Sequence, residues 1–343
     1  MIEIANICRI CGSERGHRVL SVREMMFGLR ESFLYFVCRE CGCAQISQVP
    51  EDLRPYYPDR YYSLISNLDR PEGLLPRVFF RSLRLMAPIV RRFLLSQNAI
   101  VRMPRMTLAR WDLRFLVLEM MSHARITKQS SILDVGCGGG FIPYCLKQAG
   151  FRRVVGVDPF IERELKYQNG LQVLKQDLLQ FRDSTSERFD LVMFNHSLEH
   201  MEHHDVMLTA AADLLTPGGC ILVRIPIVDC DPFVEYQEHL VGLDAPRHLI
   251  VHSQRSLEII AKRAGLEVDQ VLFDSNTQQF WASEQYRRDI PLFSERSYQC
   301  NKQGSIFTRR ELREFARRAA HLNHTHRGDR AGFFLRKPSG TSQ

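Results

Sequence analysis

The chain has 343 residues, of which 45% are hydrophobic and 25% charged, and its formal net charge is +7 at pH 7. This length and composition predict a folded protein of about two units with a sizeable buried core. The first six residues lack the basic start and long apolar run of a signal peptide, and no run approaches a membrane span, so we expect a cytoplasmic protein.

The N-terminal segment contains two C-x-x-C-G sequences, Cys8–Gly12 and Cys38–Gly42. Each is a tight turn that offers two thiolates, and four sulfurs close a tetrahedral shell around one zinc ion with no position open for catalysis. The apolar run Phe33–Val37 between them suits a small ribbon that needs the metal to fold. We therefore predict a structural zinc ribbon over residues 1–50 in a reducing compartment. Its predicted ligands are Cys8, Cys11, Cys38 and Cys41.

Two alternatives remain open for these cysteines. Free thiols or redox pairs satisfy the same spacing, and Cys43 is a fifth, spare thiol nearby. Zinc ribbons also bind nucleic acid, but the acidic residues of this segment offset several of its arginines, and no interleaved basic and aromatic pattern stands out. The ribbon is therefore predicted to be structural.

Residues 51–115 combine a tyrosine-rich loop, Arg54–Tyr62, with a basic stretch. Within that stretch, Leu74–Leu95 has apolar and arginine positions that segregate on helices broken near its two prolines. This pattern predicts a helical linker that caps the main domain. The alternative is an amphipathic surface that meets anionic lipid as a peripheral membrane contact, or a phosphate-bearing substrate.

An apolar strand at Ser131–Val135 leads into a glycine-rich turn that ends at Gly140. The glycines let the backbone turn sharply and approach a ligand, and a second apolar strand ends at Asp158, where a carboxylate accepts hydrogen bonds from ribose hydroxyls. Asp134 stands two residues before the first glycine, where its charge opposes a pyrophosphate and favours a ligand with an amino group and a sulfonium. The motif therefore favours a methyl-donor cofactor over a dinucleotide.

The sequence Leu133–Gly140 resembles the first motif of class I S-adenosylmethionine (SAM) dependent methyltransferases. Val173–Leu178, Phe189–Phe194 and Asn195–His200 resemble later motifs of that family and follow in the same order. The resemblance implies SAM as the cofactor, with Asp177 accepting from the adenine amino group. The cofactor-binding residues that it implies are Asp134, Val135, Gly136, Cys137, Gly138, Gly140, Asp158, Pro159, Asp177, Leu178, Asn195 and His196.

The resemblance also implies an α/β fold, with a doubly wound, mostly parallel, seven-stranded Rossmann-like sheet within residues 116–343. Apolar runs predict the strands near 131–135, 153–157, 171–175, 189–194, 220–225, 268–273 and 331–336. A long insert, residues 274–330, separates the last two strands and is expected to shape the acceptor pocket. Ligands are expected at the carboxyl ends of the parallel strands.

Methyl transfer from a sulfonium is an in-line displacement, in which the protein aligns the acceptor and removes its proton. His248, in the loop after the fifth strand, is our first candidate for the base, and His200 is a weaker candidate. In the alternative interpretation, Asp244, Arg247 and His248 form a structural cap for the helix that starts at Ser253.

The ribbon, the tyrosine-rich loop and the core together resemble bacterial methyltransferases found with polysaccharide and sugar biosynthesis. That resemblance implies a small-molecule acceptor that is a sugar or glycan intermediate. The alternatives are a zinc-ribbon RNA or DNA methyltransferase and a non-catalytic SAM-binding scaffold. Asn195-His-Ser197 stands where enzymes that methylate exocyclic amines carry an Asn-Pro-Pro-Tyr-like turn, which makes nucleic acid the less favoured partner.

Overall fold

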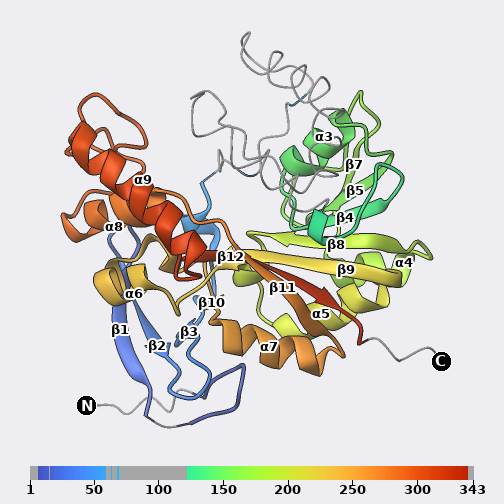
Figure 1. Cartoon of the computed structure of the whole chain (residues 1–343), viewed down its shortest axis with the longest axis horizontal. Coiled ribbons are helices and arrows are strands. Elements are labelled where there is room, and N and C mark those ends of the chain that lie inside the picture. The colour runs from blue at the N-terminus through green and yellow to red at the C-terminus, as the bar shows by residue number, and fades with distance from the viewer. Residues whose placement is uncertain (1–6, 15, 59–62, 64–67, 69–121, 339–343) are drawn as a thin grey trace. The chain divides into compact units, whose positions relative to one another are not determined.

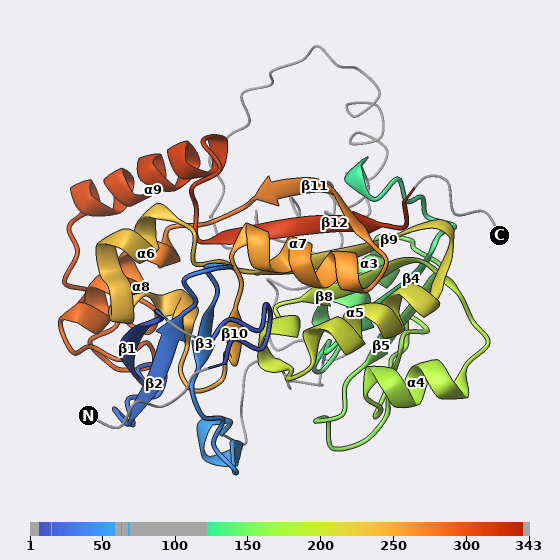
Figure 2. The same cartoon turned by 90° about the horizontal axis from the view of Figure 1, so that it is seen from below.

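The computed structural model describes residues 7–14, 16–58, 63, 68 and 122–338 (Figures 1 and 2). The chain divides into two compact units, each assembled from separated stretches. The ribbon unit comprises Met1–Asp59, His196–Leu208 and Arg224–Phe333, and the glycine-loop unit comprises Arg60–Asn195, Thr209–Val223 and Phe334–Gln343. The basic linker and the end of the tyrosine-rich loop lie outside the described residues. The division into residues 1–50, 51–115 and 116–343 stays a prediction.

A parallel sheet forms the centre of the glycine-loop unit. β4 (Ser131–Val135) pairs in parallel with β5 (Arg153–Val157) on one side and with β8 (Phe189–Asn195) on the other. β5 pairs in parallel with β7 (Gln172–Leu174), and β7 pairs antiparallel with the short β6 (Leu165–Lys166). All of β4 is buried, as expected for an apolar strand covered on both faces.

The full sheet has eight strands among the described residues, in the order β11-β12-β9-β8-β4-β5-β7-β6. β9 (Leu215–Pro226) and β12 (Arg330–Arg336) each have residues in both units, and β11 (Glu267–Phe273) belongs to the ribbon unit. The seven predicted strands are all present, and β6 is the additional one. Its two residues are too few to form the periodic pattern by which a strand is predicted.

The connections of the sheet reverse direction at β4. The chain leaves β4 through the glycine turn and α3 (Phe141–Gln148) to reach β5 on one side, whereas β8 lies on the other side. In doubly wound sheets, ligands bind at such a point, beyond the carboxyl ends of the strands. The glycine turn therefore has the position expected of a binding loop.

The remaining helices of the described residues are divided between the two units. The glycine-loop unit contains α4 (Leu178–Ser184), and α5 (His204–Asp213) has residues in both units. The other helices belong to the ribbon unit: α6 (Asp231–Tyr236), α7 (Gln254–Arg263), α8 (Gln278–Arg287) and α9 (Arg309–His324). The 3-10 turns whose residues are all described include η1 (Arg54–Tyr56), η4 (Leu198–His200), η5 (Gln237–His239) and η6 (Val241–Leu243).

The predicted insert is built on two helices. α8 and α9 lie side by side in both views, and Phe280 of α8 stacks on Phe315 of α9 with ring centroids 5.6 Å apart (Figures 1 and 2). Within the described part of the chain, every helix is too short or too polar to cross a membrane.

A second sheet lies within the ribbon unit, with strand order β1-β2-β3-β10. β1 (Arg18–Arg23), β2 (Ser32–Val37) and β3 (Ala44–Ile46) form an antiparallel meander. β10 (Ile250–Val251) comes from the segment after β9 and pairs antiparallel with β3. The ribbon's sheet is therefore completed by a strand that lies far along the chain.

Candidate functional site

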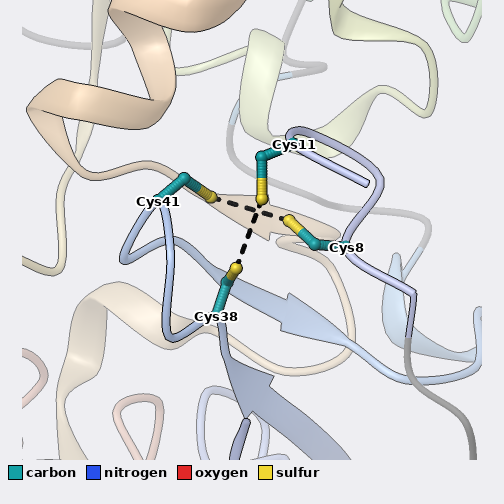
Figure 3. A group of neighbouring side chains, drawn as sticks. All are labelled: Cys8, Cys11, Cys38 and Cys41. Atoms are coloured by element: carbon teal, nitrogen blue, oxygen red, sulfur yellow. Dashed lines mark hydrogen bonds between the residues drawn. The ribbon is translucent and has the colours of Figure 1, made fainter. Parts of the chain in front are cut away.

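The four predicted zinc ligands point their sulfurs toward one another (Figure 3). The Sγ atoms of Cys8 and Cys41 are 3.6 Å apart, those of Cys11 and Cys38 are 3.5 Å apart, and all four lie within 4.8 Å of one another. Zinc–sulfur bonds of about 2.3 Å in a tetrahedron set neighbouring sulfurs about 3.8 Å apart. The four thiols, all free of disulfide bonds, therefore fit a zinc shell.

Two matching backbone turns hold these cysteines. The amide of Gly12 donates to the Cys8 carbonyl at 2.8 Å, and the amide of Gly42 donates to the Cys38 carbonyl at 2.9 Å. Both glycines have φ of +77°, in the left-handed region that residues with a Cβ rarely adopt. This geometry explains why a glycine follows each C-x-x-C pair.

Cys43 lies beside the cluster, with its Sγ 3.4 Å from that of Cys41 and 3.8 Å from that of Cys8. The side-chain amide of Gln45 donates to the sulfurs of both Cys8 and Cys43, at 2.9 and 3.0 Å. A hydrogen bond donated to sulfur stabilises its thiolate form. Gln45, which is fully buried, thus supports the cluster from outside the four predicted ligands.

The glycine turn is tied to the end of β5 by Asp158. One carboxylate oxygen of Asp158 accepts from the amide of Gly138 and the other from the amide of Phe160, both at 2.8 Å. Gly138 and Gly140 have φ of +55° and +83°, and a Cβ on Gly140 would lie 2.6 Å from the Val173 side chain. Glycine is therefore required here by both backbone conformation and space.

The two carboxylates beside the turn are buried, with Asp134 2% exposed and Asp158 5% exposed. Burial, and then the nearby charge of Asp158, raises the pKa of Asp134 to about 8. Burial also raises the pKa of Asp158, against the effect of the three amides that donate to it, those of Phe160, Gly138 and Ile161. A cationic ligand would favour the ionised form of both groups.

The remaining predicted cofactor residues lie at the ends of neighbouring strands or helices. Asp177 is the N-cap of α4, where its side chain accepts from the amide of Gln180 at 2.8 Å, and Leu178 begins that helix. Asn195 ends β8, and His196, with φ of +52°, donates its amide to the carbonyl of Arg224. Their contacts with a cofactor remain predictions.

In the ribbon unit, both candidate bases lie together with Glu199. The rings of His200 and His248 are 4.7 Å apart between centroids, and the Nε2 atom of His248 is 3.9 Å from a carboxylate oxygen of Glu199. The Nδ1 atom of His200 is 3.0 Å from the Arg247 carbonyl, and that of His248 is 2.8 Å from the Gly242 carbonyl. Because a carbonyl only accepts, each Nδ1 carries the proton and each Nε2 keeps its lone pair.

Burial sets the charge of this cluster. It lowers the pKa of His200 to about 3 and also lowers the pKa of His248, so both imidazoles are neutral at pH 7. It raises the pKa of Glu199 to about 8. The two imidazoles therefore offer unprotonated nitrogens beside a carboxyl group that burial keeps largely uncharged.

A buried ion-pair network holds the backbone next to His248. The guanidinium of Arg247 is fully buried and lies 2.6 Å from Asp244 and 2.9 Å from Glu24. It also donates to the carbonyl of Tyr56 at 3.1 Å. Burial opposes ionisation of Asp244, but Arg247 outweighs it and holds the pKa of Asp244 below its ordinary value. α7 is capped by Ser253 in a capping box, so the predicted cap by the residues around Arg247 is wrong.

Residues 102–271 match the family model of a methyltransferase domain. The chain contains a methyltransferase domain. All the predicted cofactor residues and both candidate bases lie within the matched range, whereas the ribbon cysteines and the insert lie outside it.

Curated relatives match parts of this methyltransferase domain. The mitochondrial ubiquinone biosynthesis O-methyltransferase of Mus musculus is 29% identical over 102 residues, 27% of each chain. The tRNA U34 carboxymethyltransferase of Ruthia magnifica subsp. Calyptogena magnifica is 24% identical over 119 residues, 33% of this chain and 37% of the relative. The chain thus spans well under half the length of these relatives. A solved SAM dependent methyltransferase from Archaeoglobus fulgidus aligns at 18% identity with a TM-score of 0.40, covering 66% of this chain and 94% of that one.

Sequence reasoning missed the buried position of Glu199 and the partnership of Arg247 with Glu24. Glu199 follows β8 of the methyltransferase domain in a short 3-10 turn and has no exposure. No local pattern marks either residue, because burial of a charged side chain depends on segments distant in sequence.

Proposed function

We propose that this protein transfers a methyl group from SAM to a small-molecule acceptor. The observation that carries the proposal is the bond between the Gly138 amide and Asp158 across a β4–α3–β5 unit, within a matched methyltransferase domain. SAM supplies a methyl group activated by its sulfonium. The chain supplies the loop, the carboxylates and a means of removing the acceptor's proton.

The residues present fit such a cofactor. The Asp158 carboxylate accepts from the amides of Gly138, Phe160 and Ile161 and, with about four lone-pair sites, can still accept from a ribose hydroxyl. Asp134 is a buried carboxyl group that a cationic amino acid moiety or sulfonium would stabilise in its ionised form. The glycines place no Cβ on the turn, and Ser63 packs closely against it, with its carbonyl accepting from the Gly139 amide at 2.7 Å.

His248 remains our first candidate for the base and His200 the second. Both are neutral imidazoles whose Nε2 atoms keep their lone pairs, because their Nδ1 protons are held by carbonyls. A base of this kind accepts a hydroxyl proton at neutral pH.

For the acceptor we propose a sugar or glycan intermediate, on the combination of ribbon, tyrosine-rich loop and core. Because the relatives include O-methyltransferases of ubiquinone biosynthesis, hydroxyl acceptors outside the sugars belong in the comparison. The protein is incubated with radiolabelled SAM and a panel of nucleotide sugars, phenols and RNA. The compound that takes up the label shows which class of acceptor is methylated. Label transferred to RNA alone would favour the nucleic-acid alternative.

We further propose that Cys8, Cys11, Cys38 and Cys41 hold one structural zinc ion. Four thiolates fill a tetrahedral shell and leave no open position, so such an ion stabilises the fold and takes no part in the reaction. The sulfur spacing and the paired turns support this assignment.

Calorimetric titration with S-adenosylhomocysteine tests the cofactor. We expect binding by the intact chain and at least about tenfold weaker binding by Asp158→Ala, because that change releases the Gly138 amide and removes the acceptor for ribose (about 1.4 kcal/mol per tenfold). Asp183→Ala, which removes a carboxylate exposed by 67%, is the matched control and should bind normally. Wild-type affinity in the Asp158 variant would contradict the assignment.

A further inference from the structure

We propose that Glu199, His200 and His248 form a second metal site, one that binds a divalent cation through one carboxylate and two imidazoles. Their candidate ligand atoms all lie within 4.8 Å of one another. All three residues belong to the ribbon unit, and none is among the four cysteines. Binding of the ion does not depend on the proposed methyl transfer. Only the role that we give the ion rests on that proposed function.

The first observation is an unpartnered carboxylate oxygen. The Glu199 side chain has no exposure, and its Oε1 atom lies 3.3 Å from the Nδ1 atom of His196. Its Oε2 atom is buried with no hydrogen-bond partner among the described residues. A buried polar oxygen without a partner is costly, and coordination to a cation would both satisfy that oxygen and favour the ionised form of the group.

The second observation is the orientation of the two imidazoles. Each holds its Nδ1 proton against a backbone carbonyl, that of Arg247 for His200 and that of Gly242 for His248. Metal-binding histidines characteristically donate their other ring N–H in this way, which fixes the tautomer and makes the free nitrogen a better ligand. The Nε2 atom of His248 lies 3.9 Å from Oε1 of Glu199 and 3.8 Å from Oδ2 of Asp244, and the Nε2 atom of His200 likewise keeps its lone pair.

The ligand set selects a class of ion. Oxygen and imidazole ligands suit zinc, iron, manganese and related divalent ions, whereas the four thiolates of the ribbon select zinc in a closed shell. Three protein ligands leave positions open for water or an acceptor hydroxyl. The His248 side chain is 12% exposed, so the site is not sealed from solvent.

Such an ion would take over the task assigned above to a histidine base. A hydroxyl bound to a divalent cation loses its proton far more easily than a free one. His200 and His248 then act as ligands.

Electron paramagnetic resonance of Mn²⁺ titrated into the full-length protein, with its cysteines already filled with zinc, tests the site. Mn²⁺ is the probe because it disfavours thiolates. We expect one bound equivalent in the wild type and about 10- to 100-fold weaker binding in Glu199→Gln and His248→Gln. Glu202→Gln is the matched control, because it changes a carboxylate on the same segment whose side chain is 62% exposed, and it should bind as the wild type does.

The affinity for S-adenosylhomocysteine of each variant, measured in parallel, reports whether the chain is folded. Co²⁺ absorption, whose bands distinguish nitrogen and oxygen ligands from sulfur, provides a second probe. Absence of Mn²⁺ and Co²⁺ binding beyond the ribbon, or equal binding by Glu199→Gln and the wild type, would overturn the metal site. If the wild type does not bind S-adenosylhomocysteine, that result would instead overturn the proposed function.

Discussion

Asp134 shows how strongly a single residue of this protein depends on its surroundings. Its carboxyl group lies within β4, 2% exposed, and the strand pairs on both sides. Burial and the charge of Asp158 raise its pKa to about 8, from an ordinary value of 3.8. In the protein without ligand, Asp134 therefore keeps its proton at a pH where the unfolded chain has lost it.

This difference predicts a pH dependence of stability. Between about pH 4 and pH 8 the folded protein binds more protons than the unfolded one, so the contribution of Asp134 to stability falls as the pH rises, by up to about 1 kcal/mol per pH unit. The melting temperature of the ligand-free protein should fall less steeply with rising pH in Asp134→Asn than in the wild type. Asp183→Asn should follow the wild type, and an unchanged slope in the Asp134 variant would contradict the raised pKa.

Among the elements, the two cysteine turns are the most self-contained. Each is closed by a glycine amide bonded to the carbonyl of the pair's first cysteine, and each glycine has the same φ. Local sequence is enough to determine such a turn. Local sequence does not determine which sulfurs would bind the same ion. The Sγ atom of Cys43 lies 3.4 Å from that of Cys41, as close as the Sγ atom of Cys8 at 3.6 Å.

Cobalt substitution distinguishes the four ligands from the fifth thiol. We expect Cys43→Ser to retain the thiolate-to-cobalt charge-transfer absorption of the wild type, because Cys43 is not among the four grouped sulfurs. Cys38→Ser should lose much of that absorption and unfold more readily, because an incomplete shell holds the ion poorly. The assignment of ligands fails if the two variants behave alike, or if Cys43→Ser is the more damaging.

At the scale of the whole molecule, the chain divides into two units that are each discontinuous in sequence. Within the ribbon unit, Arg247 binds Glu24 of the N-terminal segment and Asp244 of the segment after β9. β10 pairs with β3 between the same two parts of the chain. A strand pair and a buried ion network together therefore join the N-terminal segment to the rest of its unit.

Replacement of Arg247 by Met should show how much the buried ion network contributes to stability. The change leaves the carboxylates of Glu24 and Asp244 buried without their cation, and we expect a loss of about 3–5 kcal/mol in the free energy of unfolding. Urea unfolding measures it, followed by tryptophan fluorescence in a Trp111→Phe background that leaves Trp281, which lies in the same unit, as the reporter. Arg317→Met changes an arginine whose side chain is 78% exposed and should cost less than about 1 kcal/mol. Similar losses in the two variants would show that the network contributes little.

The sequence by itself determined the features that depend on neighbours along the chain. Apolar runs located β4, β5 and β8 to within a residue, because a strand covered on both faces needs a continuous apolar run. The glycine spacing predicted the sharp turn after β4, because a positive φ and close packing tolerate no side chain there. The paired C-x-x-C-G sequences likewise predicted two turns that the structure contains.

Only the tertiary structure decided which distant residues meet. It joined β10 to β3, placed Arg247 between Glu24 and Asp244, and brought Glu199 next to His248. None of these contacts has a local signature, since hydrogen bonding between separate strands and the burial of charged side chains are settled by how the whole chain packs. For that reason the cofactor loop could be predicted from sequence, whereas the second metal site could only be inferred from the fold.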